Sequence, residues 1–423
     1  AYSTIDVSAD NRLVTVMGTV VNEASSYVVF EVTGVQDQWI SLSLGTTGSG
    51  TGHASVGTDF LPNLEYLVGS TWTSYTGGMI QIADAGGKLL VRTAVLQDTP
   101  FESTQANYET LKLTAKNAAG TSNVTTDGTN FLADGTARIR DDGQGSIYLG
   151  GNTTFNADTS GSGFPAYLDD DRPVTVDNIV VNEASPWAMF TITGYANQVL
   201  SLALSNGTAT VGDGNPADGT EDYSPDLQYW NGAAWTAYNG TSVTMTGTTL
   251  LVRTAVHQDT LFEGQHVFNL GVTKQSSNTT VYGSASIYDD GTGKIYAFDN
   301  VNDGTPTITS GPGAGFDDDR TLTINSPLVN EASDYVVFTL TGNSGQTVSL
   351  QLQDESSNGT VSGKANILEN QTLKIWDGVA WVNYDANNLP TFDGNGKIFV
   401  RVDIIAEQDS PYEGAETFKL NAT

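Results

Sequence analysis

Short stretches in which apolar and polar residues alternate recur along the whole chain. Residues 41–44, 200–204 and 348–352 place Leu or Val at every second position. A period of two is typical of a β-strand with one buried face. Clusters of Gly, Asn, Asp and Thr separate these stretches, and capped stretches with helical periodicity are nearly missing. The pattern predicts an all-β chain made of antiparallel β-sandwiches.

The sequence Asn-Glu-Ala-Ser occurs three times, beginning at Asn22, Asn182 and Asn330. Repeats as long as these are domains rather than the short rungs of a solenoid. We therefore expect three homologous, immunoglobulin-like β-sandwiches in tandem, arranged as an extended rod. The expected first, second and third repeats are residues 1–149, 164–297 and 316–423, and the expected linkers, rich in Gly, Thr, Ser and Asn, are residues 150–163 and 298–315.

The third repeat is expected to lack its last strand. The first two repeats close with an Ile-x-Asp-Asp-Gly segment, at 139–143 and 287–291, whereas the third reaches Thr423 without one. A truncated sandwich would belong to a longer chain, with neighbouring repeats as partners. The alternative is a sandwich that has fewer strands. An unpaired edge would favour aggregation.

The composition narrows the possible partners. Asp and Glu number 48 against 17 Lys and Arg, a formal charge of −31, so nucleic acid is not an expected partner. No apolar run approaches the ~20 residues of a membrane helix, so direct membrane insertion is not expected. Cysteine is absent, which excludes disulfides and thiolate-bound zinc, and three histidines are too few for a His-rich transition-metal centre. A hard cation fits best.

Acidic residues gather on one turn in each repeat, just before a predicted strand. Calcium takes six to eight oxygen ligands, and carboxylates on such a turn can converge on one ion, whereas Mg²⁺ demands stricter octahedral geometry. The alternative is a solvated turn, where Asp and Gly are common anyway. The acidic residues of these turns are Asp98, Glu102 and Glu109, then Asp259 and Glu263, then Asp409, Glu413 and Glu416.

The order of these motifs resembles the Calx-β domain, which recurs in tandem in large RTX-type bacterial surface adhesins. The resemblance rests on Asn-Glu-Ala-Ser, an Asp-aromatic pair (Asp59-Phe60, Asp222-Tyr223), the acidic turn and Ile-x-Asp-Asp-Gly. It implies seven-stranded sandwiches that bind calcium at one end. Besides the acidic turns, the implied calcium ligands are Glu23, Glu183 and Glu331 and the closing residues Asp141, Asp142, Asp289 and Asp290.

Two departures from the family pattern affect the implied sites. His266 stands where the other repeats have Glu109 and Glu416, so we expect weaker binding there or a water ligand. The third repeat has no closing aspartates, and Ala365-Asn366 replaces the Asp-aromatic pair, so its site should be incomplete.

Two triple-aspartate runs suggest a second kind of cation site. Asp169, Asp170 and Asp171 close the first linker, and Asp317, Asp318 and Asp319 close the second. The mostly extended chain from Asp171 to Glu183 spans roughly 30–40 Å at ~3.3 Å per residue, so each run should face the preceding repeat. An ion there could bridge two domains. The alternative is a charged linker that extends by self-repulsion.

A tryptophan motif also recurs, at residues 72–75, 230–238 and 376–384. We favour a tight hairpin whose tryptophans pair across the strands and face the core. The alternative is a platform on which a sugar stacks.

No catalytic motif is evident, and acids that recur in every repeat indicate ion sites rather than a glycosidase pair, so we do not expect an enzyme. The expected function is a calcium-rigidified extender of a secreted bacterial cell-surface adhesin, which spaces a binding module from the cell and supports adhesion or biofilm. Two alternatives are a calcium-dependent glycan- or protein-binding module and a surface-layer or matrix protein.

Overall fold

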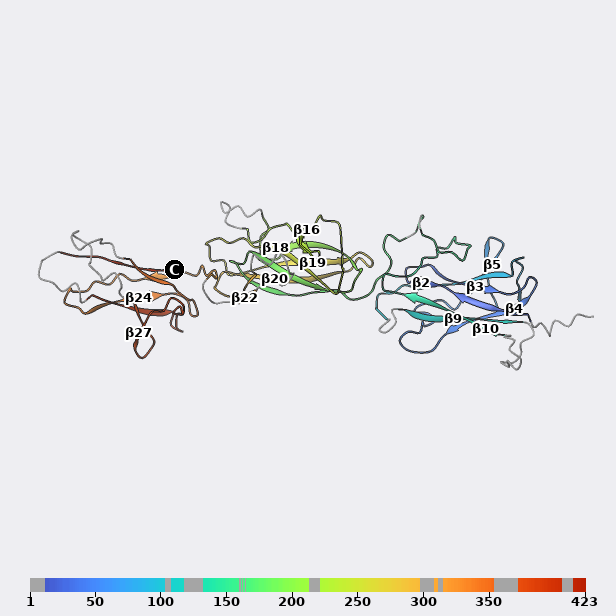
Figure 1. The fold of residues 1–423 in the computed structure, drawn as a ribbon, viewed down its shortest axis with the longest axis horizontal. Helices are drawn as coiled ribbons and strands as arrows, with labels where there is room; N and C mark the ends of the chain where they lie inside the picture. The colour runs from blue at the N-terminus through green and yellow to red at the C-terminus, as the bar shows by residue number, and fades with distance from the viewer. Residues whose placement is uncertain are drawn as a thin grey trace, which may run out of the picture.

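The computed structural model describes residues 12–102, 108–117, 132–159, 161, 163, 165–212, 221–296, 308–310, 315–353, 372–404 and 414–423. All its regular elements are β-strands, and Figure 1 shows them as three β-sheet bodies that follow one another along the long axis. The fold class predicted from the alternation is therefore confirmed. Within the described residues there is no helix with the length and apolar character needed to cross a membrane.

The first repeat forms a sandwich of two five-stranded sheets. Its strands are β1 (Thr15–Gly18), β2 (Val20–Asn22), β3 (Tyr27–Thr33), β4 (Trp39–Thr46), β5 (Glu65–Val68), β6 (Thr71–Ser74), β7 (Ile80–Gln81), β8 (Lys88–Ala94), β9 (Glu109–Asn117) and β10 (Leu132–Arg140). The sheet orders are β1-β3-β8-β5-β6 and β2-β10-β9-β4-β7. Neighbouring strands are antiparallel except β2 and β10, which are parallel.

The second repeat has the same topology. Its strands are β11 (Thr175–Val176), β12 (Ile179–Asn182), β13 (Trp187–Thr193), β14 (Val199–Asn206), β15 (Gln228–Trp230), β16 (Trp235–Ala237), β17 (Val243–Thr244), β18 (Thr249–Ala255), β19 (Gln265–Lys274) and β20 (Thr280–Tyr288). They are ordered β11-β13-β18-β15-β16 and β12-β20-β19-β14-β17. A small antiparallel pair, β21 (Lys294–Tyr296) and β22 (Ile308–Ser310), follows.

The third repeat keeps one complete five-stranded sheet, of order β23-β24-β28-β26-β27. Within the described ranges its second sheet consists of β25 and β29, without a counterpart of β10 or β20 beside β29. The strands are β23 (Thr323–Ile324), β24 (Tyr335–Thr341), β25 (Leu350–Gln353), β26 (Lys374–Trp376), β27 (Trp381–Asn383), β28 (Lys397–Asp403) and β29 (Lys419–Ala422).

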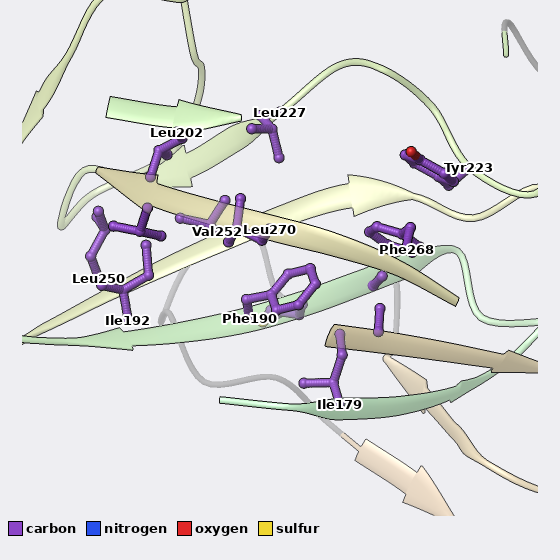
Figure 2. Close-up of a cluster of buried hydrophobic side chains, with 14 of the residues drawn as sticks. Ile179, Phe190, Ile192, Leu202, Tyr223, Leu227, Leu250, Val252, Phe268 and Leu270 are labelled. Atoms are coloured by element: carbon purple, nitrogen blue, oxygen red, sulfur yellow. The ribbon is translucent and has the colours of Figure 1, made fainter. Parts of the chain in front are cut away.

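Each repeat has its own hydrophobic core, because alternate residues of the facing strands point inward. Figure 2 shows the core of the second repeat, where Phe268 of β19 lies between Phe190 and Tyr223. Its ring stacks on Tyr223 at 4.1 Å and meets Phe190 edge-on at 5.9 Å. Tyr223 is 1 % exposed and its counterpart Phe60 is fully buried. These two aromatic anchors fix the position of the aspartate that precedes each of them.

The tryptophan motif forms the expected hairpins. Trp230 pairs with Trp235, and Trp376 with Trp381, across antiparallel strands, with ring centroids 5.7 and 5.5 Å apart. The expectation that these rings face the core is confirmed for Trp235, which is partly buried and packs against the core of the second repeat. The Arg253 guanidinium stacks 4.1 Å from the Trp235 ring. Trp376 of the third repeat is instead 39 % exposed.

Candidate metal centres

The asparagine of Asn-Glu-Ala-Ser ties the following aspartate run to the end of the preceding repeat. Oδ1 of the fully buried Asn22 accepts the backbone N–H of Asp169 at 2.8 Å, and Nδ2 donates to the carbonyl of Asp169 at 3.0 Å. Asn182 makes the same two bonds to Asp317, at 2.7 and 3.0 Å. Each run therefore faces the preceding repeat, as the sequence predicts.

Within each run the side chains alternate, because the backbone is extended and successive side chains point to opposite sides. The first and third aspartates face the preceding repeat. The middle ones, Asp170 and Asp318, instead form two-bond ion pairs with Arg172 and Arg320, at 2.6–2.8 Å. The interpretation of Asp170 and Asp318 as metal ligands is therefore corrected.

The second closing aspartates also lie outside the clusters. Asp142 is paired with Arg140, whose Nε donates at 3.0 Å, and Asp290 accepts the backbone N–H of Thr292 at 3.1 Å. Their predicted role as ligands is corrected for the same reason, since adjacent residues of an extended chain face opposite ways. Asp141 and Asp289 remain beside the acidic turns, because Glu102 N–H donates to Asp141 at 3.0 Å and Gly264 N–H to Asp289 at 3.0 Å.

The first junction site brings together Glu23 and Asp98 of the first repeat with Asp169 and Asp171 of the run. Single carboxylate oxygens of Glu23, Asp98 and Asp171 lie within 4.8 Å of one another. Asp169 and Asp171 are only 2 % and 6 % exposed. Among the described residues, Oδ2 of both, and Oδ1 of Asp98, have no hydrogen-bond partner. Buried oxygens without donors are an expensive arrangement unless a cation occupies the space between them.

The pKa values at the first junction site also show that burying these carboxylates in their charged form is unfavourable. Burial raises the pKa of Glu23 to about 9; the backbone N–H of Asp98 opposes this, and the charges of Asp169, Asp98 and Asp171 add to it. Burial and the charge of Asp169 raise the pKa of Asp171 to about 7. A divalent cation would hold these carboxyl groups in their charged form.

The second junction site repeats this arrangement with Glu183, Asp317 and Asp319, whose ligand atoms also lie within 4.8 Å of one another. Asp259 N–H donates to Glu183 at 3.1 Å, as Asp98 does to Glu23 at 2.9 Å. Oδ2 of Asp317 and of Asp319 are buried without a hydrogen-bond partner in the described part of the chain. Burial, with the charge of Asp317 adding, raises the pKa of Glu183 to about 9 and that of Asp319 to about 6.

A first turn site lies next to the first junction site. It consists of Asp59, Asp98, Glu102 and Glu109, and its first three members have ligand atoms within 4.8 Å of one another. Burial followed by the charge of Asp59 raises the pKa of Glu102 to about 7 and that of Glu109 to about 8. Asp98 belongs to both sites, so two cations bound there would share one carboxylate.

The second turn site differs by one residue. Asp222, Glu263 and His266 have ligand atoms within 4.8 Å of one another. His266 Nδ1 is hydrogen-bonded to Asp222 and lies 3.5 Å from Glu263. Burial lowers the pKa of His266, but the bond to Asp222 and the charges of Asp222 and Glu263 outweigh it, so the net shift is upward.

Asp59 and Asp222 are site residues that the predicted ligand set lacks. Each is the aspartate of an Asp-aromatic pair. The recurrence of that pair in two repeats is the feature of the sequence that could have identified them as ligands. In the third repeat Asp409 and Glu413 lie outside the described residues. Glu331 is exposed and Glu416 half-buried, and neither belongs to a three-ligand group within the described ranges.

The chain is thus a tandem β-sandwich protein with carboxylate clusters at the ends of its first two sandwiches. No protein-family model matches its sequence, and no curated protein matches it. Solved structures that align with it include CBD12 from CALX1.2, at 12 % identity over 64 % of this chain and 99 % of that one, with a TM-score of 0.20.

Two further alignments involve other multidomain proteins. Extracellular cadherin domains 1–4 of protocadherin gamma B7 align at 11 % identity over 98 % of this chain and 76 % of that one, with a TM-score of 0.28. The C-terminal domain of the Streptococcus pyogenes antigen I/II-family protein AspA aligns at 8 % identity over 66 % and 100 %, with a TM-score of 0.28.

Proposed function

We propose that the chain is a calcium-binding extender segment of a secreted bacterial cell-surface adhesin, in which bound calcium stiffens the junctions between sandwiches. The observation that carries the proposal is the pair of junction sites. In each, carboxylates of one repeat and of the following aspartate run face one another, and buried oxygens have no hydrogen-bond donor among the described residues.

Calcium suits these sites better than other common cations. Every ligand atom grouped at the two junction sites and the first turn site is a carboxylate oxygen. Calcium accepts six to eight oxygens in flexible geometry, and water or backbone carbonyls complete its shell. The first junction site and the first turn site share Asp98. Together their carboxylates carry enough negative charge for more than one divalent ion.

The proposed mechanism is mechanical. The junction already has a short β-bridge, because Asp171 N–H donates to Asp141 O at 2.8 Å and Gly143 N–H to Asp169 O at 2.7 Å. Without a cation, the ionised carboxylates on the two sides repel one another and oppose this bridge. With calcium they attract a common ion, so the junction closes and the rod stiffens.

In this proposal the partners are calcium ions and neighbouring repeats, and the protein works outside the cell by spacing a binding module from the surface. It needs no catalysis, no nucleic acid and no insertion into a membrane. Binding to the folded state alone stabilises by mass action, about 2.7 kcal/mol per site when free calcium is 100 times the dissociation constant.

Calorimetric melting combined with small-angle X-ray scattering tests the proposal. We expect calcium to raise the melting temperature and to give a longer, stiffer particle than chelator does. The double variant Asp169→Asn/Asp171→Asn should lose the stiffening at the first junction alone. Melting and scattering that are the same with calcium and with chelator would contradict the proposal.

A further inference from the structure

We propose that the second turn site, made of Asp222, Glu263 and His266, binds a transition-metal dication of the Zn²⁺ class rather than calcium. This assignment does not depend on calcium binding at the junction sites. It rests on the donor atoms of this one site and on its comparison with the first turn site.

The three donor atoms suit a small tetrahedral ion. Zinc binds imidazole nitrogen at about 2.0–2.1 Å and carboxylate oxygen at about 2.0–2.2 Å, which places tetrahedral ligand atoms about 3.3–3.5 Å apart. His266 Nδ1 lies 3.5 Å from Glu263 Oε2 and is hydrogen-bonded to Asp222 Oδ1. In the metal-free site a proton lies between nitrogen and carboxylate, and zinc would replace that proton with a small outward shift of Asp222.

The equivalent site of the first repeat supplies an internal comparison. There Glu109 occupies the position of His266, and among the described residues the ligand atoms grouped at that site are carboxylate oxygens. Calcium is bound by oxygen, whereas imidazole suits zinc, copper, iron and nickel. The same fold position therefore presents donors for different metals in the two repeats. A protonated His266 would moreover repel calcium, and zinc binds the neutral ring.

His257 reaches this site through its backbone alone. Its N–H donates to the carbonyl of Asp222 at 3.0 Å, just as that of Leu96 does to Asp59 at 2.9 Å. Among the described residues, the ligand atoms that lie within 4.8 Å of one another come from Asp222, Glu263 and His266. Three protein ligands leave the fourth tetrahedral position of a zinc ion to water.

Zinc titration of the full chain in the presence of millimolar calcium tests the proposal. Calcium competes for the carboxylate sites, so we expect calorimetry to detect one tightly held Zn²⁺ per chain. Histidine-selective ¹⁵N NMR should then show zinc-dependent shifts of the ring nitrogens of His266. His53, which is bonded to Thr47 in the first repeat, serves as the control and should not shift.

Exchanging the two positions makes the test specific. His266→Glu should weaken zinc binding roughly 100-fold or more, and Glu109→His should create a second zinc site. The calcium-dependent melting of His266→Glu checks that the variant is folded and that the junction sites still work. Equal zinc affinity in the wild type and His266→Glu, or no retained zinc in the wild type, would overturn the proposal.

Discussion

The two junctions of the molecule are built from the same motif but are packed differently. At the first, Asp169 to Arg172 are 2–9 % exposed, and Lys274 and Ser276 donate to the carbonyl of Asp170 at 3.1 Å. The ring of Phe101, on the acidic turn, also meets Tyr195 of the second repeat at 6.4 Å.

The second junction has the same hydrogen bonds between asparagine and aspartate, here Asn182 and Asp317, but the residues around them are more exposed to solvent. Asp317 to Asp319 are half-buried, Asn343 occupies the position of Tyr195, and Phe262, the counterpart of Phe101, is 48 % exposed. The Asn-Glu-Ala-Ser motif therefore fixes how the carboxylates are arranged at both junctions, whereas the neighbouring side chains decide how deeply those carboxylates are buried. Burial in turn sets how strongly the carboxylates need a cation, and the pKa of Asp171, about 7, exceeds that of Asp319, about 6.

The largest effect should come from removing the motif asparagine of each junction, Asn22 at the first and Asn182 at the second. Asn22→Ala and Asn182→Ala each delete bonds to buried backbone groups, so we expect a loss of at least about 3 kcal/mol in the repeat concerned. Asn330→Ala is the matched control, because Asn330 is exposed, and it should change stability by less than about 0.5 kcal/mol. Calorimetry, with hydrogen exchange to assign each transition, measures these effects. Equal losses in all three variants would show that the motif acts only as a local turn.

The pH dependence of the calcium-free protein should follow the raised pKa values. Burial raises the pKa of Glu23 and of Glu183 to about 9 and that of Glu109 to about 8 in the folded state, against 4.5 for a solvent-exposed glutamate. The folded state thus keeps protons that the unfolded chain has lost, and stability falls as pH rises from about 4.5 to about 9. In chelator we expect a melting temperature several degrees higher at about pH 5 than at about pH 8. Calcium should shrink or reverse this trend, and a rise in stability with pH in chelator would contradict it.

A single amide substitution separates the two junctions. Asp171→Asn removes one buried charge, so in chelator it should stabilise the protein by about 1 kcal/mol, whereas in calcium it should weaken binding about tenfold. Asp319→Asn should act in the same directions but less strongly, because Asp319 is less buried. Melting temperatures in both conditions give the comparison. Destabilisation by Asp171→Asn in chelator would mean that the carboxylate forms a favourable contact without metal.

The smallest effect concerns the aromatic contact between Phe101 and Tyr195, which has no counterpart among the described residues of the second junction. Phe101→Ala should cost about 1 kcal/mol or less and loosen the first junction in scattering experiments. Phe262→Ala, at the exposed counterpart, should have no measurable effect on stability. If Phe101→Ala and Phe262→Ala changed stability and scattering equally, the two junctions would not differ in aromatic packing.

Much of the fold was predictable from the sequence, because strand alternation and the three copies of Asn-Glu-Ala-Ser act locally. The orientation of the aspartate runs was also predictable, from the length of extended chain to Glu183. The set of ligand residues could not be predicted, for a physical reason. In an extended run, alternate side chains point toward the site, and the sequence does not say which ones. The structure shows that the middle aspartate of each run points away, because it pairs with Arg172 or Arg320.

Asp59 and Asp222 illustrate a second limit. Each lies far along the chain from its acidic turn, and it reaches the site only because a buried aromatic neighbour anchors it in the core. The recurrence of the Asp-aromatic pair indicated importance but not location. Burial itself, which separates the two junctions, depends on side chains such as Lys274 and Tyr195 from distant strands and loops.

A crystal structure of the full chain grown in calcium, with anomalous data at long wavelength, would locate any bound ions at the junctions. We predict a calcium peak among Glu23, Asp98, Asp169 and Asp171, and a second among Glu183, Asp317 and Asp319. Density in which these side chains turn outward into water, with no ion at either junction despite abundant calcium, would contradict this prediction.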